Sequence, residues 1–453
     1  MNLYTMLHQR AERGTPVRLG VIGMGKFAGM YLAQVPKTPG VHVVGVADVA
    51  PAVARANLER VGWPAQRYSA SSLAAAHAGG ATHVGEDWQA LVSYPGIDII
   101  VEATGNPIAA VDHALAAFRH GKHVVMVTVE ADAFCGPLLA LRAREAGVVY
   151  SLAYGDQPAL ICDLVDWART AGFSVVAAGR GHKWLTHFAQ STPETVWSYY
   201  GLTAEQAATG GLNAKMFNSF LDGSKPAIEC TAVCNATGLT PAPEGLSYPS
   251  ASIDQIPTVM RPRAEGGQLH HKGQIEVICS LDSRGQPLPY DIRFGVWVVF
   301  EAETEYIRRC FSEYGVRTDP SGRYACLYKR WHLIGLEAGI SVASVALRGE
   351  PTGSPTGWRA DAIATAKRDL KAGEILDGEG GYTVVGKLMA AAESLKLCAL
   401  PLGLAHGWKL LNAVPAGRPL RWIDVATDEA NRAVKARREM ERVFAGEAQL
   451  PAG

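Results

Sequence analysis

A glycine-containing motif near the N-terminus constrains the fold of this chain more than any other feature. An apolar run over residues 17–22 leads into the sequence GMGKFA (23–28), which fits the pattern G-x-G-x-x-G/A. Residues 26–35 are expected to form a helix, and a second apolar run over 41–47 ends in Asp48. Strand, tight turn, helix and strand in this order are typical of the first unit of a dinucleotide-binding fold.

The residues of this motif have distinct physical roles in holding a dinucleotide. Gly23 permits a sharp turn, and Gly25 leaves room for a pyrophosphate to approach the backbone. Lys26 and Phe27 lie in the first helical turn, where free N–H groups and the helix dipole favour phosphate. Asp48 follows Gly25 by about 20 residues, the usual offset of the acid that binds the adenosine ribose hydroxyls. An acid at this position favours NADH over NADPH.

Composition and charge argue against several classes of function. A length of 453 residues predicts two or three domains. The formal net charge is zero and no long basic stretch occurs, so no nucleic-acid partner is expected. The longest apolar runs, such as 97–103, are strand-sized, and the polar N-terminus lacks the apolar core of a signal peptide. Eight scattered cysteines without a C-x-x-C pair are typical of reduced thiols in a cytoplasmic enzyme, away from the membrane.

Short apolar strands alternate with helices up to about residue 152, which predicts a doubly wound parallel α/β sheet. A strand over 98–103 is followed by the sequence TGNP (104–107), and an apolar run over 123–129 is followed by an acid. Ligands of such sheets bind at the carboxyl ends of the strands. We therefore expect four residues to line the nicotinamide side of the binding cleft. They are Thr104, Gly105, Asn106 and Glu130.

The pattern changes twice along the rest of the chain. After the nucleotide-binding domain, predicted over 1–158, helices and strands alternate less regularly, which favours an α+β domain for substrate binding and dimerisation over 159–358. Short strands with glycine turns then predict a small β-rich domain over 359–453, with a charged helix near its end.

Several long segments resemble one bacterial family. They include THFAQSTPETVWSYYGLT (186–203), NAKMFNSFLDGSK (213–225), GGQLHHKGQIEV (266–277) and ATAKRDLKAGEILDGEGGYTVVGKLM (364–389). The chain resembles the 1-deoxy-D-xylulose 5-phosphate reductoisomerase-like family over nearly its whole length. The nucleotide domain of this family is similar to that of homoserine dehydrogenase, and its C-terminal part is a SAF domain.

The resemblance implies an NAD(P)H-dependent oxidoreductase that forms a homodimer and acts on a small phosphorylated substrate. The reaction that it implies is the isomerisation and hydride reduction of a keto-sugar phosphate, a step of isoprenoid precursor synthesis. The resemblance favours NADPH, whereas Asp48 favours NADH, so both cofactors stay open.

Lys183 is the first candidate for this chemistry. It follows an apolar strand over 175–178 and a predicted Gly179-x-Gly181 turn, so its side chain is expected to project into the cleft. There a lysine can donate to a carbonyl oxygen that gains negative charge during reduction. His182 titrates near neutral pH and suits proton transfer. A solvated loop lysine and a structural histidine are the alternative interpretations.

A second group of candidates lies within residues 213–225. Its members are Asn213, Lys215, Asn218, Asp222 and Lys225. If the segment is one helix, the last four share a face through i, i+3 and i+4 spacing. Under the family resemblance, the two lysines would hold the substrate phosphate and the aspartate would take part in proton transfer. The alternative is the solvated face of an amphipathic helix.

A third group surrounds His270, a further substrate-binding candidate next to His271. Adjacent residues on a strand point to opposite sides, so at most one of the two histidines is expected to be a ligand. No recognisable metal-binding spacing occurs, and the metal ligands stay unknown, although Mg²⁺ or Mn²⁺ would suit carboxylates such as Glu130, Asp222 or Glu229. Lys367 could bind a phosphate, but it is more simply interpreted as a surface charge.

Three functions therefore stay open. The first is a reductoisomerase or reductase that acts on a phosphorylated keto-sugar with NADPH or NADH, with or without Mg²⁺ or Mn²⁺. The second is a homoserine dehydrogenase-like enzyme that acts on another hydroxy acid, amino acid or polyol. The third is a non-catalytic nucleotide-binding sensor, which the polar groups of the central domain argue against.

Overall fold

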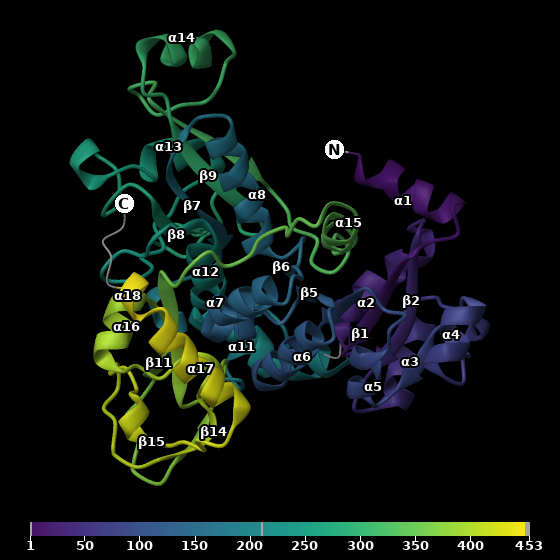
Figure 1. The fold of residues 1–453 in the computed structure, drawn as a ribbon. Coiled ribbons are helices and arrows are strands. Elements are labelled where there is room, and N and C mark those ends of the chain that lie inside the picture. The colour runs from purple at the N-terminus through teal and green to yellow at the C-terminus, as the bar shows by residue number, and fades with distance from the viewer. Residues whose placement is uncertain (1, 210–211, 449–453) are drawn as a thin grey trace. The chain divides into compact units, whose positions relative to one another are not determined.

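The computed structural model describes residues 2–209 and 212–448, and the chain divides into two compact units (Figure 1). Unit 1 consists of Met1–Leu160 and Leu333–Ser354. Unit 2 consists of Ile161–His332 and Pro355–Gly453. The end of the predicted nucleotide domain lies close to the first division, whereas the predicted boundary between residues 358 and 359 stays a prediction.

A six-stranded parallel sheet forms the centre of unit 1. Its strands are β1 (Val17–Ile22), β2 (Val41–Ala47), β3 (His83–Gly85), β4 (Ile99–Glu102), β5 (His123–Met126) and β6 (Tyr150–Leu152). They lie in the order β3-β2-β1-β4-β5-β6, which is the order of a doubly wound dinucleotide-binding sheet. The strands are almost wholly buried, as expected for a parallel sheet that is covered on both faces. The predicted α/β fold class is therefore confirmed.

The helices of unit 1 follow the strands, with one addition from later in the chain. They are α1 (Leu3–Glu12), α2 (Lys26–Gln34), α3 (Pro51–Arg60), α4 (Leu73–Gly79), α5 (Trp88–Ser93), α6 (Pro107–Arg119), α7 (Val129–Glu145) and α15 (Gly339–Arg348). Helix α15 belongs to the core of this unit, because Val342 and Val345 are buried in one cluster with Leu7 of α1 and Tyr31 of α2. A segment far along the sequence thus completes the nucleotide-binding unit.

A mixed four-stranded sheet forms the centre of unit 2. Its strands are β7 (Ser174–His182), β8 (Gln274–Cys279), β9 (Val296–Glu301) and β10 (Tyr324–Lys329), in the order β10-β9-β7-β8. Strand β7 is parallel to β8 and antiparallel to β9. The accompanying helices are α8 (Gln157–Thr170), which begins in unit 1, α9 (Val196–Tyr200), α10 (Ala204–Thr209), α11 (Ala214–Asp222), α12 (Ser224–Thr237), α13 (Ile256–Val259) and α14 (Glu305–Glu313).

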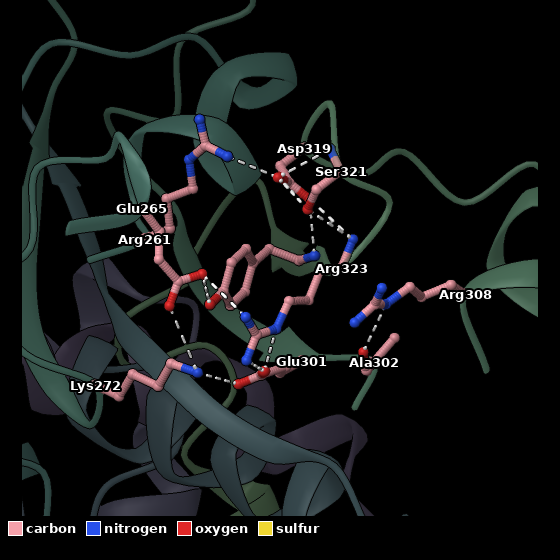
Figure 2. Close-up of polar contacts among 10 residues, drawn as sticks. Arg261, Glu265, Lys272, Glu301, Ala302, Arg308, Asp319, Ser321 and Arg323 are labelled. Atoms are coloured by element: carbon pink, nitrogen blue, oxygen red, sulfur yellow. Dashed lines mark hydrogen bonds and ion pairs between the residues drawn. The ribbon is translucent and has the colours of Figure 1, made fainter. Parts of the chain in front are cut away.

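A network of ion pairs fixes the end of this sheet at which β7 begins (Figure 2). The buried carboxylate of Glu301 binds Lys272 at 2.6 Å and also pairs with Arg323. The fully buried Asp319 accepts from the guanidinium of Arg261 at 2.7 Å and from the backbone N–H of Arg323 at 3.0 Å. The network therefore holds the connection before β10 against the segments that lead into β8.

The C-terminal part of unit 2 is rich in short strands, as predicted. Strands β11 (Ala360–Ala366) and β13 (Val384–Ala390) form an antiparallel pair, and β12 (Ile375–Asp377), β14 (His406–Leu410) and β15 (Val425–Ala426) form a second small sheet. Helices α16 (Ala391–Leu397), α17 (Arg432–Val443) and α18 (Ala445–Ala448) complete this part. A buried ion pair of 2.5 Å between Arg437 and Asp361 attaches α17 to β11. Among the described residues, no helix is long and apolar enough to cross a membrane.

Candidate functional site

The glycine turn after β1 provides space for a phosphate group. Gly23 has a φ of +90°, and a Cβ atom on it would lie 2.7 Å from the carbonyl oxygen of Ala103, so a larger residue would not fit. Gly25 precedes α2 as its N-cap, and no atom outside its immediate neighbourhood lies within 4 Å of where its Cβ would be. Lys26 is exposed and Phe27 is half-buried in the first turn of α2. This open start of a helix fits the pyrophosphate of a dinucleotide.

Asp48 holds the glycine turn from the end of β2. Its Oδ2 accepts from the backbone N–H of Met24 at 2.7 Å, and its Oδ1 accepts from that of Ala50 at 2.8 Å. The side-chain amide of Asn57 donates to the carbonyl of Met24 at 2.8 Å, which fixes the turn from the other side. A carboxylate oxygen has two lone pairs, so Asp48 can still accept from ribose hydroxyls.

Thr104, Gly105 and Asn106 form a loop at the carboxyl end of β4, as predicted, in which Thr104 is half-buried and the other two residues are exposed. Gly105 has a φ of +68°, and the side chain of Asn106 caps α6 by accepting from the backbone N–H of Ile108 at 3.1 Å. Strand β4 is the parallel neighbour of β1, so this loop and the glycine turn lie at the same edge of the sheet. The structure thus brings these predicted cofactor-binding segments together.

The prediction for Glu130 needs a correction. Strand β5 ends at Met126, and Glu130 lies in the first turn of α7 instead of at the end of a strand. Sheet-type hydrogen bonding ends where the N–H of Val127 donates to the carbonyl of Glu102 at 2.9 Å, and Thr128 is already the N-cap of the helix. The apolar run continues through this change of backbone, because the start of α7 is also buried.

The glycines before Lys183 belong to a strand, so the predicted turn at 179–181 is wrong. Strand β7 runs on to His182, and the glycines are required by close neighbours instead. A Cβ on Gly179 would lie 1.7 Å from the carbonyl oxygen of Glu276, and one on Gly181 would lie 1.9 Å from that of Ile292. Lys183 therefore follows directly after the end of β7.

Lys183 and His182 have different electrostatic environments. The half-buried ammonium of Lys183 donates to the carbonyl of Tyr199 at 2.8 Å. Its burial, and secondly the charge of Arg293, lower its pKa from the usual value. Burial, followed by the charge of Arg180, lowers the pKa of His182 far more, so this imidazole is neutral near pH 7. Its Nε2 lies 2.6 Å from the carbonyl oxygen of Phe220, which is the contact of a structural histidine.

Residues 213–225 form two helices, so the prediction of one helical face is wrong for Lys225. Gly223, with a φ of +91°, separates α11 from α12 and places Lys225 on the second helix. Asn213 is the N-cap of α11, where its Oδ1 accepts from the backbone N–H of Met216 at 3.1 Å. The left-handed backbone conformation at the glycine ends the first helix, which helical spacing alone does not reveal.

The polar face of α11 binds the C-terminal part of the chain. Lys215 donates to the carbonyl of Asp377 at 2.6 Å, and the amide of Asn218 donates to that of Gly380 at 2.9 Å. Asp222 forms an ion pair of 2.6 Å with Lys367, and both side chains are at least 95% buried. Lys367 is therefore not a surface charge as predicted. Burial raises the pKa of Asp222, and the nearby Lys367 opposes this rise only in part.

The structure separates His270 from Lys183. His270 precedes β8, whose first residue pairs with Ala177 near the start of β7, whereas Lys183 follows the last residue of β7. At about 3.3 Å per residue, the two side chains belong to ends of the sheet that are roughly 20 Å apart. His270 therefore does not join Lys183 in one site within unit 2.

Two of the three carboxylates suggested as metal ligands are paired with cations. Asp222 binds Lys367, and the buried Glu229 binds the buried Arg180. In residues 2–209 and 212–448, no three His, Cys, Asp or Glu side chains form a group that could hold a metal ion. Arg180 and Arg293 were missed by sequence reasoning. Arg180 could have been singled out from the sequence, because it is a basic residue near the carboxyl end of an apolar strand.

Two family models match consecutive parts of the chain. The model "Homoserine dehydrogenase, NAD binding domain" matches residues 19–150, and the model "Oxidoreductase DRL, catalytic domain" matches residues 155–338. No curated protein matches the chain.

Solved structures similar to the chain include three dehydrogenases and reductases. An NAD-binding oxidoreductase from Klebsiella pneumoniae is 20% identical over 38% of this chain and 44% of its own, with a TM-score of 0.26. The 1-deoxy-D-xylulose 5-phosphate reductoisomerase of Zymomonas mobilis is 17% identical over 48% of this chain and 57% of its own, with a TM-score of 0.32. A probable dehydrogenase from Thermotoga maritima is 13% identical over 74% of this chain and 90% of its own, with a TM-score of 0.34. The chain spans about half the length of the first two, and likeness at this level carries no argument about activity.

The family matches agree with the geometry of unit 1. The first covers the sheet with the open glycine turn, and the second begins where α8 leaves that sheet. The prediction of an enzyme is thereby confirmed. The chain is an NAD(P)-dependent oxidoreductase, in which residues 19–150 are similar to the NAD-binding domain of homoserine dehydrogenase and residues 155–338 are similar to the catalytic domain of oxidoreductase DRL.

Proposed function

We propose that this oxidoreductase interconverts a keto group and an alcohol on a small anionic substrate, with Lys183 as the proton donor and Arg293 as the anion-binding residue. The observation that carries the proposal is a pair of cations without a counter-ion. In the described part of the chain, no carboxylate forms an ion pair with the side chain of Lys183 or Arg293, and the carboxylate of Asp291 accepts from the backbone N–H of Arg293 at 2.8 Å. The guanidinium of Arg293 lies over the ring of Phe294, 4.9 Å from its centre.

Three segments of unit 2 meet around these cations. The end of β7 lies against residues 292–295, because the N–H of Gly181 donates to the carbonyl of Gly295 at 3.0 Å. The end of α9 supplies the carbonyl of Tyr199 that binds Lys183. Both cations are half-buried, and the charge of Arg293 disfavours the protonated form of Lys183. A phosphate or carboxylate bound between them would relieve this repulsion.

The lowered pKa of Lys183 makes its ammonium a better general acid than that of an ordinary lysine. A bound nicotinamide would supply or accept the hydride at the substrate carbon. Lys183 would give a proton to the oxygen of that carbon during reduction and take it back during oxidation. Its hydrogen bond to Tyr199 uses one of three N–H groups and leaves two to face a substrate.

Two substrate classes fit this site. A keto-sugar phosphate fits the resemblance, and its reaction would include the isomerising reduction of 1-deoxy-D-xylulose 5-phosphate. A hydroxy acid or amino acid fits the homoserine dehydrogenase-type match of the first domain. The proposal contains no metal ion, because Asp222 and Glu229 are already paired with cations. The homodimer, the SAF assignment and the role in isoprenoid synthesis stay predictions.

The test is a panel of substrates followed by nicotinamide absorbance. Phosphorylated keto-sugars and keto acids should oxidise the reduced cofactor, and their uncharged counterparts should have a much lower kcat/KM. Arg293→Ala should remove most of the difference between charged and uncharged substrates, whereas Arg284→Ala, at an exposed loop arginine, should preserve it. Equal turnover of charged and uncharged substrates by the wild type would overturn the anionic substrate class.

We further propose that the preferred cofactor is NADH. The carboxylate of Asp48 is fixed by two backbone N–H groups, so it cannot easily turn away from a 2′-phosphate. The nearest following arginine, Arg55, donates to the carbonyls of Tyr68 and Val84, both at 3.0 Å, and is thus held away from a compensating role.

The affinity for NADH should therefore exceed that for NADPH by at least about a hundredfold, in keeping with close like-charge repulsion. Asp48→Asn removes the charge but keeps an acceptor oxygen, so it should narrow the ratio by about tenfold. Calorimetric titration of both cofactors into both proteins checks this. Tighter binding of NADPH than of NADH by the wild type would contradict the preference.

A further inference from the structure

A buried carboxylate lies beneath the loop that follows β4. Glu102 is the last residue of this strand and is wholly buried. Its Oε1 accepts from the hydroxyl of Thr104 at 2.6 Å and lies 3.1 Å from Nδ1 of His113. Its Oε2 accepts from the hydroxyl of Thr128 at 2.5 Å. Glu102 thus joins β4, α6 and the start of α7.

The two threonine hydroxyls also bind the backbone of the loop that follows β4. The hydroxyl oxygen of Thr128 accepts from the N–H of Gly105 at 3.0 Å, and that of Thr104 accepts from the N–H of Asn106 at 3.2 Å. A hydroxyl has a single proton, and each of these protons is donated to Glu102. The lone pairs of both oxygens must therefore face the loop. The carboxylate decides which way both hydroxyls point.

This loop lies at a functional edge of the sheet. Gly23, at the cofactor-binding turn, fits against the carbonyl of Ala103, the residue between Glu102 and the loop. In a doubly wound sheet, a dinucleotide crosses the crevice where the strand order reverses, with its adenosine half beside β2 and its nicotinamide half beside β4. Gly105 and Asn106 are exposed on the β4 side.

Stability alone does not account for an acid at this position. A buried carboxylate is costly, and the partners of Glu102 are two neutral hydroxyls, the backbone N–H of Thr104 at 3.4 Å and a histidine, with no lysine or arginine among the described residues. A carboxylate is, however, an acceptor at both oxygens, which an amide is not. A carboxylate can therefore accept from one hydroxyl at each of its two oxygens, as Glu102 does here.

We propose that Glu102 is a positioning residue for the nicotinamide half of the cofactor. It acts through Thr104 and Thr128, which hold the N–H groups of Gly105 and Asn106 in place. The proposal rests on the assignment of NAD(P) binding to unit 1. It predicts that loss of the arrangement weakens binding of the whole dinucleotide but leaves binding of its ADP-ribose portion intact.

The experiment compares NADH with ADP-ribose by titration calorimetry. Thr128→Val removes the hydroxyl with little change of shape, and Thr128→Ser restores it. Thr128→Val should raise the Kd for NADH about tenfold, the loss expected for hydrogen bonds to a charged group, and should change that for ADP-ribose less than twofold. Thr128→Ser should bind both ligands as the wild type does. Glu102→Gln should follow Thr128→Val, because its amide nitrogen cannot accept from a hydroxyl.

Asp98→Asn is the matched control. Asp98 precedes the opposite end of β4, where its carboxylate accepts from the N–H of Arg18 at 2.9 Å, so this change should leave both affinities unaltered. Equal loss of NADH and ADP-ribose affinity in Thr128→Val, or no loss of either, would overturn the proposal. If Glu102→Gln does not fold, the two Thr128 variants still decide. If the wild type binds neither ligand, the assignment of the cofactor site to unit 1 is itself wrong.

Discussion

Replacement of Lys183 by methionine should lower kcat about a thousandfold, within the range expected for loss of a general acid. Methionine keeps much of the length of the lysine side chain but cannot give up a proton. The contacts assigned to the cofactor, at the glycine turn and Asp48, do not involve Lys183, so the Kd for NADH should stay unchanged. Steady-state kinetics with the preferred substrate, together with cofactor titration, measure both quantities.

The pH profile separates catalysis by Lys183 from a structural role. In the direction of reduction, kcat/KM should fall as the pH rises through the lowered pKa of this lysine. Arg293→Ala removes one cause of the lowered pKa of Lys183, so the decrease in kcat/KM should occur at higher pH in this variant. Lys371→Met, at an exposed lysine of the C-terminal part, should change neither kcat nor the profile. More than a tenth of the wild-type kcat in Lys183→Met would remove Lys183 from the mechanism.

Asp132 should make the stability of unit 1 depend on pH. Its side chain is fully buried in α7, accepts from the hydroxyl of Tyr150 at 2.8 Å, and has an Oδ2 without a hydrogen-bond partner. Burial raises its pKa from 3.8 to about 7. An acid with a raised folded-state pKa binds a proton on folding, so stability is greatest below the unfolded pKa and falls as the pH rises toward 7. The shift corresponds to about 4 kcal/mol of lost stability.

Asp132→Asn should therefore flatten the dependence of stability on pH between 4 and 7. Asparagine still accepts from Tyr150, although its unbonded amide group costs about 1–3 kcal/mol, so the net gain at pH 8 should be about 2 kcal/mol. Urea unfolding at several pH values measures this, with Glu59→Gln at an exposed site of α3 as the control. An unchanged slope in Asp132→Asn would show that Asp132 is charged in the folded protein at neutral pH.

The nucleotide-binding unit was largely predictable from local features. The glycine motif, the alternation of strands and helices, and the position of Asp48 all depend on residues close together in the sequence. Glu130 was misplaced because apolar character continues from β5 into the buried start of α7. Helix α15 could not be foreseen as part of this unit, since only tertiary packing places Val342 beside Leu7.

The substrate side was harder to predict for a similar reason. Lys367 is charged in the sequence and buried in the structure, because Asp222, far away in the chain, provides its counter-ion. Gly179 and Gly181 suggested a turn, whereas their real role is to let Glu276 and Ile292 approach a strand. A charged residue suggests exposure and a glycine suggests a turn, but contacts between segments that are distant in the sequence decide the outcome at these positions.

The most direct test of the central claim is the titration of NADH into the wild type and Gly25→Val. Gly25 has a φ of −77°, which any residue can adopt, and its Cβ position meets no atom within 4 Å, so the variant should fold with an unchanged Tm. The valine side chain would occupy the space assigned to the pyrophosphate. The account predicts a Kd raised at least about a hundredfold, comparable with the loss of several phosphate hydrogen bonds. Wild-type affinity in a folded Gly25→Val would contradict the account.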